Sequence, residues 1–258
     1  MYKELVSSDF RFMLKVSEEY RVDALLTFGT YPKSKAYPSF EEALLALGIP
    51  TAYEPIENAF FGDIKSVITP YGRLWFDVIY GSAYASELAH VASMLGAKAI
   101  VHIGSFGALQ PDIYPGDIVV PNRAYGNESV TRMYERTGTP LFFSAHEQLR
   151  MELAETIGKT TRDGSIVSIQ AMLAETAEDV ASWKEEGLTG VEMECASLFA
   201  VAEHFKVPVA AALYAADNLA TNTLITSEAY EKSQVHRQTA KSRLYLSALK
   251  TLLNRMQK

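Results

Sequence analysis

The last third of the chain alternates short strand-like runs with helical segments, and this alternation constrains the fold more than any other feature. Residues 190–193 and 207–215 predict strands, and residues 194–205 between them predict a helix. Residues 226–256 predict a long terminal helix. Strands that alternate with helices imply a mostly parallel sheet that carries helices on both faces.

The preceding part of the chain extends this pattern. Strands are expected at residues 24–28, 99–103, 116–121 and 165–169, and helices at residues 2–20, 39–47, 84–95, 146–157 and 176–186. Residues 61–80 predict a hairpin, because a Thr-Pro-Tyr-Gly turn signal at 69–72 separates two β-rich runs. With no repeat or linker in the chain, we expect one α/β domain over residues 1–258, with a mixed, mostly parallel central sheet flanked by helices.

Composition excludes several classes of protein. The chain has 258 residues, a net charge of -7 and a pI near 5.3, whereas nucleic-acid binding needs a basic surface. Its single cysteine, Cys195, rules out an intrachain disulfide and suits a reducing compartment. No signal peptide and no apolar run of roughly 20 residues is present. We therefore expect a cytoplasmic protein without nucleic-acid or membrane partners.

Three groups of glycine and polar residues follow expected strands. They are Gly29 with Lys33, residues 102–107, and Glu192–Glu194 with Asp217. In sheets of this kind, ligands bind outside the carboxyl ends of the strands. We therefore expect these groups to converge on one site.

The Gly-Ser-Phe-Gly sequence at residues 104–107 is expected to be a turn after a strand. Two glycines would allow backbone N–H groups to face an anion, and the Ser105 hydroxyl would add a donor. A tight turn without a ligand is the alternative. His102 lies in an apolar run, and two roles are open for it. It either contacts an anion or is an ordinary buried histidine whose hydrogen bonds are satisfied.

Three carboxylates are candidates for chemistry. Glu192 and Glu194 flank Met193 and would face opposite sides of a strand, so we expect them to differ in role. A carboxylate can accept both hydroxyls of a ribose diol, and methionine offers an apolar surface; stabilisation of the next helix is the alternative. Asp217 ends the most apolar strand, where desolvation raises a pKa and suits general-acid work; a capping role beside Asn218 is the alternative.

In their order along the chain, these motifs resemble the nucleoside phosphorylase superfamily. The matching pieces are Gly-Ser-x-Gly at 104–107, Pro-Gly-Asp at 115–117, Val-Glu-Met-Glu at 191–194 and the strand that ends in Asp217. The resemblance implies a purine-type nucleoside phosphorylase that releases free base and ribose 1-phosphate. It also implies inorganic phosphate as co-substrate, no metal or organic cofactor, and a homo-oligomer such as a hexamer built as a trimer of dimers.

The resemblance also assigns roles by position. The expected ribose contacts are Met193 and Glu194, with Glu192 in a supporting role. The expected phosphate contacts are Gly29, Lys33, His102 and Ser105. The expected base contacts are Phe106, Gly107 and Val191, and the expected catalytic acid at purine N7 is Asp217.

The chain departs from the family pattern in its cations. The family usually has arginine where His102 and Lys33 stand, and lysine lacks the bidentate fork of arginine, while histidine is largely neutral near pH 7. A third family arginine is missing near residues 60–61, as is an N-terminal histidine that contacts a neighbour's ribose. Candidates to compensate are Lys35, Lys65 and Arg73.

Three other functions stay open at this point. A nucleosidase of the same fold would use water in place of phosphate, which fits the weakened phosphate motif. A uridine-type phosphorylase is disfavoured by Asp217 and by the absence of a Gln-x-Arg pair between residues 165 and 192. A non-catalytic nucleoside-binding protein would have no need of an acid at Asp217.

Overall fold

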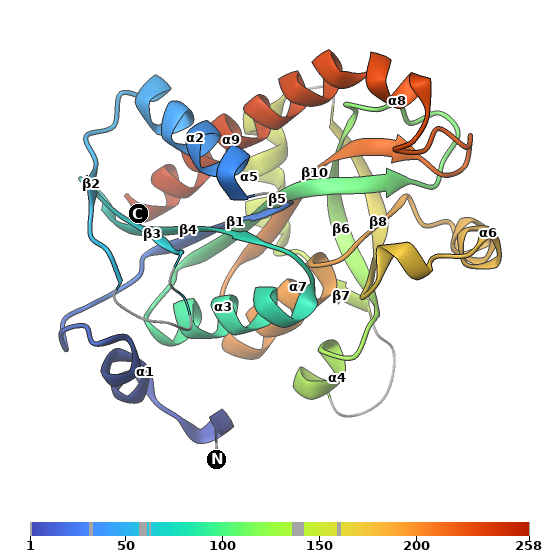
Figure 1. Cartoon of the computed structure of the whole chain (residues 1–258). Helices are drawn as coiled ribbons and strands as arrows, with labels where there is room; N and C mark the ends of the chain where they lie inside the picture. The colour runs from blue at the N-terminus through green and yellow to red at the C-terminus, as the bar shows by residue number, and fades with distance from the viewer. Residues whose placement is uncertain are drawn as a thin grey trace.

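The computed structural model describes residues 2–30, 33–56, 61, 63–135, 142–158 and 161–257. Its strands form one mixed sheet (Figure 1). The strands are β1 (Ala24–Gly29), β2 (Ala52–Tyr53), β3 (Lys65–Thr69), β4 (Gly72–Ile79), β5 (Ala99–Ala108), β6 (Ile118–Asn127), β7 (Phe142–Ser144), β8 (Thr161–Ile169), β9 (Gly190–Glu192) and β10 (Val209–Asn218).

Helices connect these strands. They are α1 (Ser7–Leu14), α2 (Lys33–Ala46), α3 (Ser82–Met94), α4 (Thr131–Tyr134), α5 (Glu147–Ile157), α6 (Ala177–Glu185), α7 (Cys195–Phe205), α8 (Glu228–Lys232) and α9 (Gln234–Met256), with short 3-10 turns at Tyr2–Glu4 and Met172–Ala174. Within the described ranges, no helix is both long enough and apolar enough to cross a membrane.

Strand β5 is the hub of the sheet. It pairs in parallel with β1 and β10 and antiparallel with β9. The pairing continues from β10 through β6 and β8 to β9, so these four strands and β5 close a ring. Strand β1 pairs with β5 outside this ring, and β4, β3 and β2 follow it in that order to the edge of the sheet. The expected mixed, mostly parallel α/β sheet is confirmed, and its hairpin is β3–β4.

Helices cover both faces of the sheet (Figure 1). On one face α2, α5 and α9 pack around a core that includes Phe40, Leu153 and Tyr245. On the other face α3 and α7 pack around a core that includes Leu88 and Phe199. Strands such as β1 are buried along their whole length, which is why they read as short apolar runs in the sequence.

The Gly-Ser-Phe-Gly sequence is not a turn, contrary to the prediction. Strand β5 continues through it to Ala108, because neighbours pair with it on both sides: Gly104 with Gly29 and Leu213, and Gly107 with Val191 and Asp217. Neither glycine has a positive φ. A concave anion site made by turn backbone is therefore absent from this segment.

Three predicted helices also differ from the structure in their bounds. Helix α2 begins at Lys33, and Ser39 lies inside it, where its hydroxyl donates to the Lys35 carbonyl at 3.3 Å. The first expected helix is shorter than predicted, because Lys15 adopts a left-handed conformation (φ 55°) that ends α1. The expected terminal helix is two helices that meet at Ser233.

Candidate active site

Glu192 stabilises the connection between β9 and α7. One oxygen of its buried carboxylate accepts the backbone N–H groups of Glu194 and Cys195, both at 2.8 Å. The other oxygen accepts the Ser168 hydroxyl, and the Ser168 oxygen in turn accepts the Ala196 N–H at 2.8 Å. These bonds satisfy N–H groups that the first turn of a helix leaves unpaired. Glu192 is thus engaged with the protein, which fits the supporting role expected of it.

Glu194 has different surroundings. Its Oε1 accepts the Gly81 N–H at 2.5 Å, while a Cβ placed on Gly29 would lie 2.9 Å from its Oε2. Burial, together with the neighbouring Glu192 carboxylate, raises the pKa of Glu194 above its usual range. One oxygen is therefore held by the protein, and the other faces the end of β1.

Gly81 and Ser82 hold the Met193–Glu194 segment in place. Ser82 Oγ donates to the Met193 carbonyl at 2.6 Å, next to the bond from the Gly81 N–H to Glu194. Gly81 has φ +86°, a conformation that favours glycine, and it allows the chain to turn from β4 into α3. Sequence reasoning missed both residues, although a Gly-Ser pair between a strand and an Ala-rich helix is a recognisable helix start.

His102 is fully buried and uncharged. Its Nδ1 lies 2.9 Å from Thr27 Oγ1, and its Nε2 has no partner in the described part of the chain. Burial lowers the pKa of His102 to about 3. A Cβ on Gly29 would lie 3.2 Å from His102 Nε2 and 2.9 Å from Glu194 Oε2, so the lack of a side chain at Gly29 leaves room between these two polar groups.

Lys33 is neutralised by acidic side chains. Its ammonium lies 3.0 Å from Asp63 and 3.6 Å from the buried Asp77. Asp77 also accepts the hydroxyls of Tyr37 and Tyr84, at 2.8 and 2.5 Å. Lys33 therefore belongs to a partly exposed polar cluster in which acidic side chains balance its charge. Tyr31 and Pro32 of its motif, and Phe60, lie outside the described residues.

Ser105 is not brought together with His102. The two residues are three positions apart on β5, so their side chains leave opposite faces of the strand. The Ser105 hydroxyl lies against that of Tyr214, its cross-strand neighbour on β10, and Tyr214 belongs to the core beneath α9. The expected phosphate contacts thus divide between the two faces of the sheet.

Three expected base-site residues lie in one row across the sheet. Gly107 on β5 pairs with Val191 on β9 and with Asp217 on β10. A Cβ on Gly107 would lie 3.3 Å from Asp217 Oδ1, so Asp217 faces the space above this glycine. Phe106 points away from that space, since its ring packs into the core against Gly190.

Asp217 has the environment expected of an acid. Burial raises its pKa to about 6, against the opposing effects of the Ile225 N–H and of Arg237. Glu175, which the sequence did not suggest, lies near it: burial and then the Asp217 charge raise the pKa of Glu175 to about 7. Two carboxyl groups with raised pKa values therefore lie near each other, which is typical of functional sites.

Other polar groups do not add to the site. Donor atoms of His102, Glu192 and Cys195 lie within 4.8 Å of one another, but both Glu192 oxygens are occupied by the bonds given above, so we assign no metal here. Arg73 is paired with Glu54 at 2.5 Å, and Lys65 stacks on aromatic rings.

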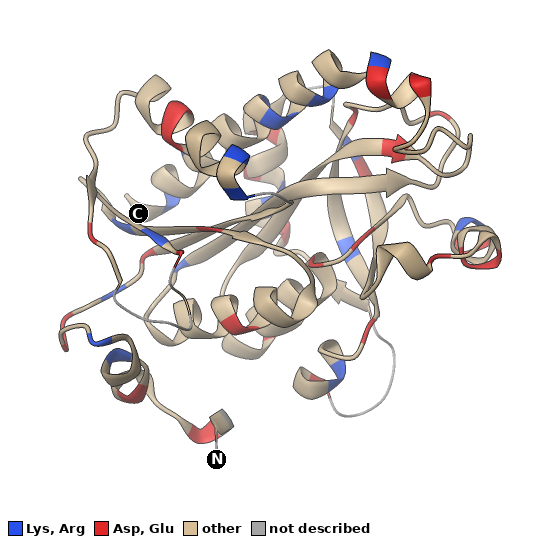
Figure 2. Ribbon diagram, in the orientation of Figure 1, with Lys and Arg blue, Asp and Glu red and all other residues tan. Residues whose placement is uncertain are grey.

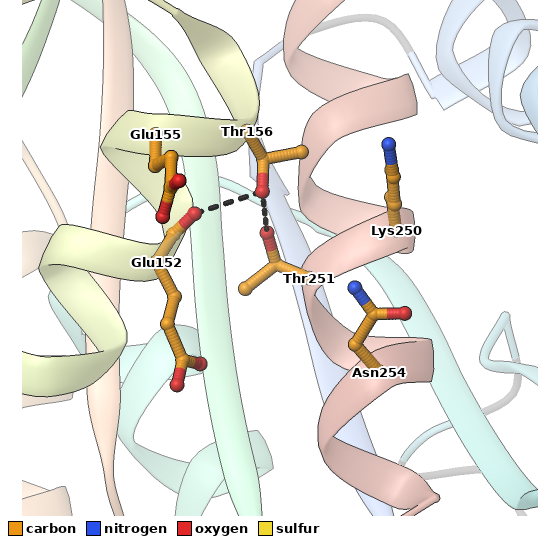
Figure 3. A pocket seen from close by; sticks show the side chains of 6 residues that line it. All are labelled: Glu152, Glu155, Thr156, Lys250, Thr251 and Asn254. Atoms are coloured by element: carbon orange, nitrogen blue, oxygen red, sulfur yellow. Dashed lines mark hydrogen bonds between the residues drawn. The ribbon is translucent and has the colours of Figure 1, made fainter.

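A cavity of about 460 Å³ lies between α5 and α9 (Figure 3). Its lining residues are Glu152, Glu155, Thr156, Lys250, Thr251 and Asn254. Thr251 and Thr156 are hydrogen-bonded across it at 3.3 Å. It contains none of the expected site residues, and we therefore place the candidate active site at the ends of β1, β5, β9 and β10 instead.

Comparison with known proteins identifies the family. The sequence model described as "Phosphorylase superfamily" matches residues 78–253. The chain belongs to the phosphorylase superfamily. The match includes every expected site residue except Gly29 and Lys33, which precede it.

Two curated members of this superfamily illustrate the relationship. The DeoD-type purine nucleoside phosphorylase of Xenorhabdus nematophila is 25% identical over 204 residues, covering 73% of this chain and 86% of the relative. The DeoD-type enzyme of Pectobacterium atrosepticum is 24% identical over 204 residues, covering 73% and 85%.

Solved phosphorylase structures show the same fold. Uridine phosphorylase from Vibrio fischeri matches with a TM-score of 0.72 and 19% identity over 92% of this chain and 94% of that one. Purine nucleoside phosphorylase from Toxoplasma gondii in complex with immucillin-H matches with a TM-score of 0.74 and 14% identity over 95% and 96%. The phosphorylase fold thus accounts for nearly the whole chain.

The buried His102 makes the stability of this phosphorylase-superfamily chain depend on pH. Between pH 6.5 and about 3 the unfolded chain binds a proton at this histidine that the folded chain does not, so acidification lowers the free energy of unfolding. Glutamine cannot titrate in this range. We compare the free energy of unfolding of the wild type with that of His102→Gln, both measured by urea denaturation. The difference between them should fall by about 2 kcal/mol when the pH is lowered from 7 to 5.

The exposed His236 offers a matched control. The stability difference between wild type and His236→Gln should change little over the same pH range. A pH-independent difference for His102→Gln as well would contradict the assignment of His102 as a buried, uncharged group.

Proposed function

We propose that this protein is a purine-type nucleoside phosphorylase, a pentosyltransferase that uses inorganic phosphate and no cofactor. The observation that carries the proposal is the position of Asp217. This buried carboxyl faces the space above Gly107, in the same row as Val191, and its pKa of about 6 leaves part of it protonated near neutral pH. Named purine nucleoside phosphorylases among the relatives support the same reading.

In this proposal, Glu194 and Met193 hold the ribose. Glu194 Oε2, the oxygen not bonded to Gly81, accepts the sugar hydroxyls, and Met193 supplies an apolar contact. The oxygen bound by the Gly81 N–H fixes the orientation of the carboxylate before substrate arrives. A fixed carboxylate lowers the entropic cost of orienting the sugar.

Asp217 then assists departure of the base. As the bond between C1′ and the base nitrogen breaks, its electron pair moves into the purine, and Asp217 donates a proton or a hydrogen bond to N7. A phosphate oxygen forms the new bond to C1′ and yields ribose 1-phosphate. Holding the sugar and stabilising the leaving base both favour the charge-separated transition state.

A nucleosidase of the same fold remains a second candidate, and a specific observation favours it. His102 is uncharged and Lys33 is ion-paired with Asp63, so two expected phosphate contacts offer no free positive charge. We further propose a cytoplasmic homo-oligomer, in keeping with the composition and the family resemblance.

The deciding experiment supplies inosine, adenosine and uridine to the protein, with and without phosphate, and follows base release. We expect release from the purine nucleosides only when phosphate is present, with ribose 1-phosphate as the second product. Equal release without phosphate would establish the nucleosidase instead. Binding of nucleosides without any release would indicate a non-catalytic protein.

Asp217→Asn should lower kcat for inosine about 100-fold, because asparagine keeps the shape of the side chain but has no acidic proton to donate. Cleavage of uridine, which lacks N7, should fall much less. Asp112→Asn removes an exposed carboxylate that pairs with Arg162 and serves as the control. An unchanged rate with inosine would remove Asp217 from the mechanism.

Glu194→Gln should raise KM for the nucleoside and lower kcat, together by about tenfold or more in kcat/KM. Glutamine has one carbonyl oxygen, which the Gly81 N–H occupies, so its amide would face the ribose hydroxyls as a donor. Glu192→Gln should instead lower the thermal midpoint, since it weakens the bonds to Glu194 and Cys195 at the start of α7. If Glu194→Gln changed only stability, the carboxylate would be structural.

A further inference from the structure

Three cationic side chains gather on the face of β5 that carries Ser105. Arg237 and Lys241 lie four residues apart on α9 and therefore on the same side of this helix. Lys35, in the first turn of α2, and Arg237 both lie close enough to Lys241 to act on its charge. The first turn of α2 is held against α9, because Tyr245 donates to the Ala36 carbonyl at 3.2 Å.

The cluster lies over the ends of the strands that form the candidate active site. The Lys241 ammonium is 5.4 Å from the centre of the Phe28 ring on β1 and 5.9 Å from that of Tyr214 on β10. The Tyr214 hydroxyl lies against Ser105, and Arg237 is near both Tyr214 and Asp217. Figure 2, drawn in the orientation of Figure 1, shows Lys and Arg along α9 and at the start of α2.

Among the described residues these cations have no ion-pair partner, although Arg237 lies near enough to Asp217 to act on its charge. Within the described residues, none of Lys35, Arg237 and Lys241 has a carboxylate within ion-pair distance. Arg237 uses Nε and one terminal nitrogen on the Ser233 hydroxyl and the Tyr230 carbonyl. Burial, followed by the charges of Lys35 and Arg237, lowers the pKa of Lys241. Like charges brought together repel one another, and a bound anion would offset that repulsion.

We propose that Lys35, Arg237 and Lys241, with the hydroxyls of Ser105 and Tyr214, bind a phosphoryl group at this edge of the sheet. Ammonium and guanidinium groups are the side chains best suited to phosphate, and the two hydroxyls add neutral donors. This cluster lies on the opposite face of β5 from His102, which is uncharged.

Two molecules could carry that phosphoryl group: free inorganic phosphate, the co-substrate in the proposed function, or a nucleotide with a 5′-phosphate. The identification of the source rests on the proposed function, whereas the anion site itself does not. The two sources are separated by using inorganic phosphate and inosine 5′-phosphate as alternative probes.

The first measurement is the thermal midpoint of the whole protein during titration with each probe. At least one probe should stabilise the wild type in a saturable manner, and Lys241→Gln should weaken that probe's apparent affinity about tenfold or more. Lys250→Gln, the same substitution at an exposed position further along α9, should leave the affinity unchanged. Lys35→Gln, also exposed, provides a second test that does not disturb the core if Lys241→Gln folds poorly.

The second measurement identifies the source from base release. If phosphate is the occupant, Lys241→Gln should raise KM for phosphate while KM for inosine stays the same. If a nucleotide is the occupant, the variant should lose the preference for inosine 5′-phosphate over inosine and keep its KM for phosphate.

Failure of this site and failure of the proposed function are distinguishable. Unchanged probe affinity in both Lys241→Gln and Lys35→Gln, or no stabilisation of the wild type by either probe, would overturn the anion site. Phosphate stabilisation that depends on Lys241, without base release from any nucleoside, would uphold the site and overturn the phosphorylase.

Discussion

The buried carboxylate of Glu192 is the interaction on which the arrangement of the site depends. Burial disfavours the charged form of this carboxyl group and raises its pKa, and hydrogen bonds from the first turn of α7 and from Ser168 oppose that effect. The same bonds tie β8, β9 and α7 together. Because Glu194 is two residues further on, its direction is set by this cap and by the Gly81 N–H, before any ligand binds.

Burial also sets the charges of the site. His102 is neutral because its complete burial disfavours the charged form, and the charge of Lys33 is balanced by Asp63 and Asp77, which lie 3.0 and 3.6 Å from its ammonium. The pKa values of Glu194, Asp217 and Glu175 are shifted in the opposite sense, so these groups keep protons more readily than ordinary carboxyl groups. One edge of the sheet thus combines these three weak acids, of which Glu194 is the proposed ribose contact, with the cations of α9.

Hydrophobic periodicity predicts much of the fold, because strands such as β1 and β10 are buried on both faces and leave apolar runs in the sequence. It does not predict that β5 continues past Gly104, because glycine is locally a turn signal while the pairing partners of β5 lie far away in the chain. The ring of five strands could not be predicted either, because the strands that close it lie far apart in the sequence.

The candidate site could likewise be predicted only in part from the sequence. Family resemblance and residue chemistry indicate Glu194, Met193 and Asp217, whose types suit a ribose and a base, although their roles stay predictions. Gly81 was missed because its contribution is a backbone N–H, which has no signature in a side chain. Glu175 was missed because only the fold brings it near Asp217.

The direction of β9 explains why the site forms at all. Strand β9 runs antiparallel to β5, with Gly190 opposite Ala108 and Val191 opposite Gly107. The chain that leaves β9 therefore runs back along β5, toward the level of Gly104 and the neighbouring Gly29, and this brings Glu194 beside His102. A parallel β9 would carry the same residues away from β1 and leave the carboxylate without its neighbours. The antiparallel pairing that makes the sheet mixed is therefore the feature that places the Glu194 carboxyl group, the proposed ribose contact, at the ends of parallel strands.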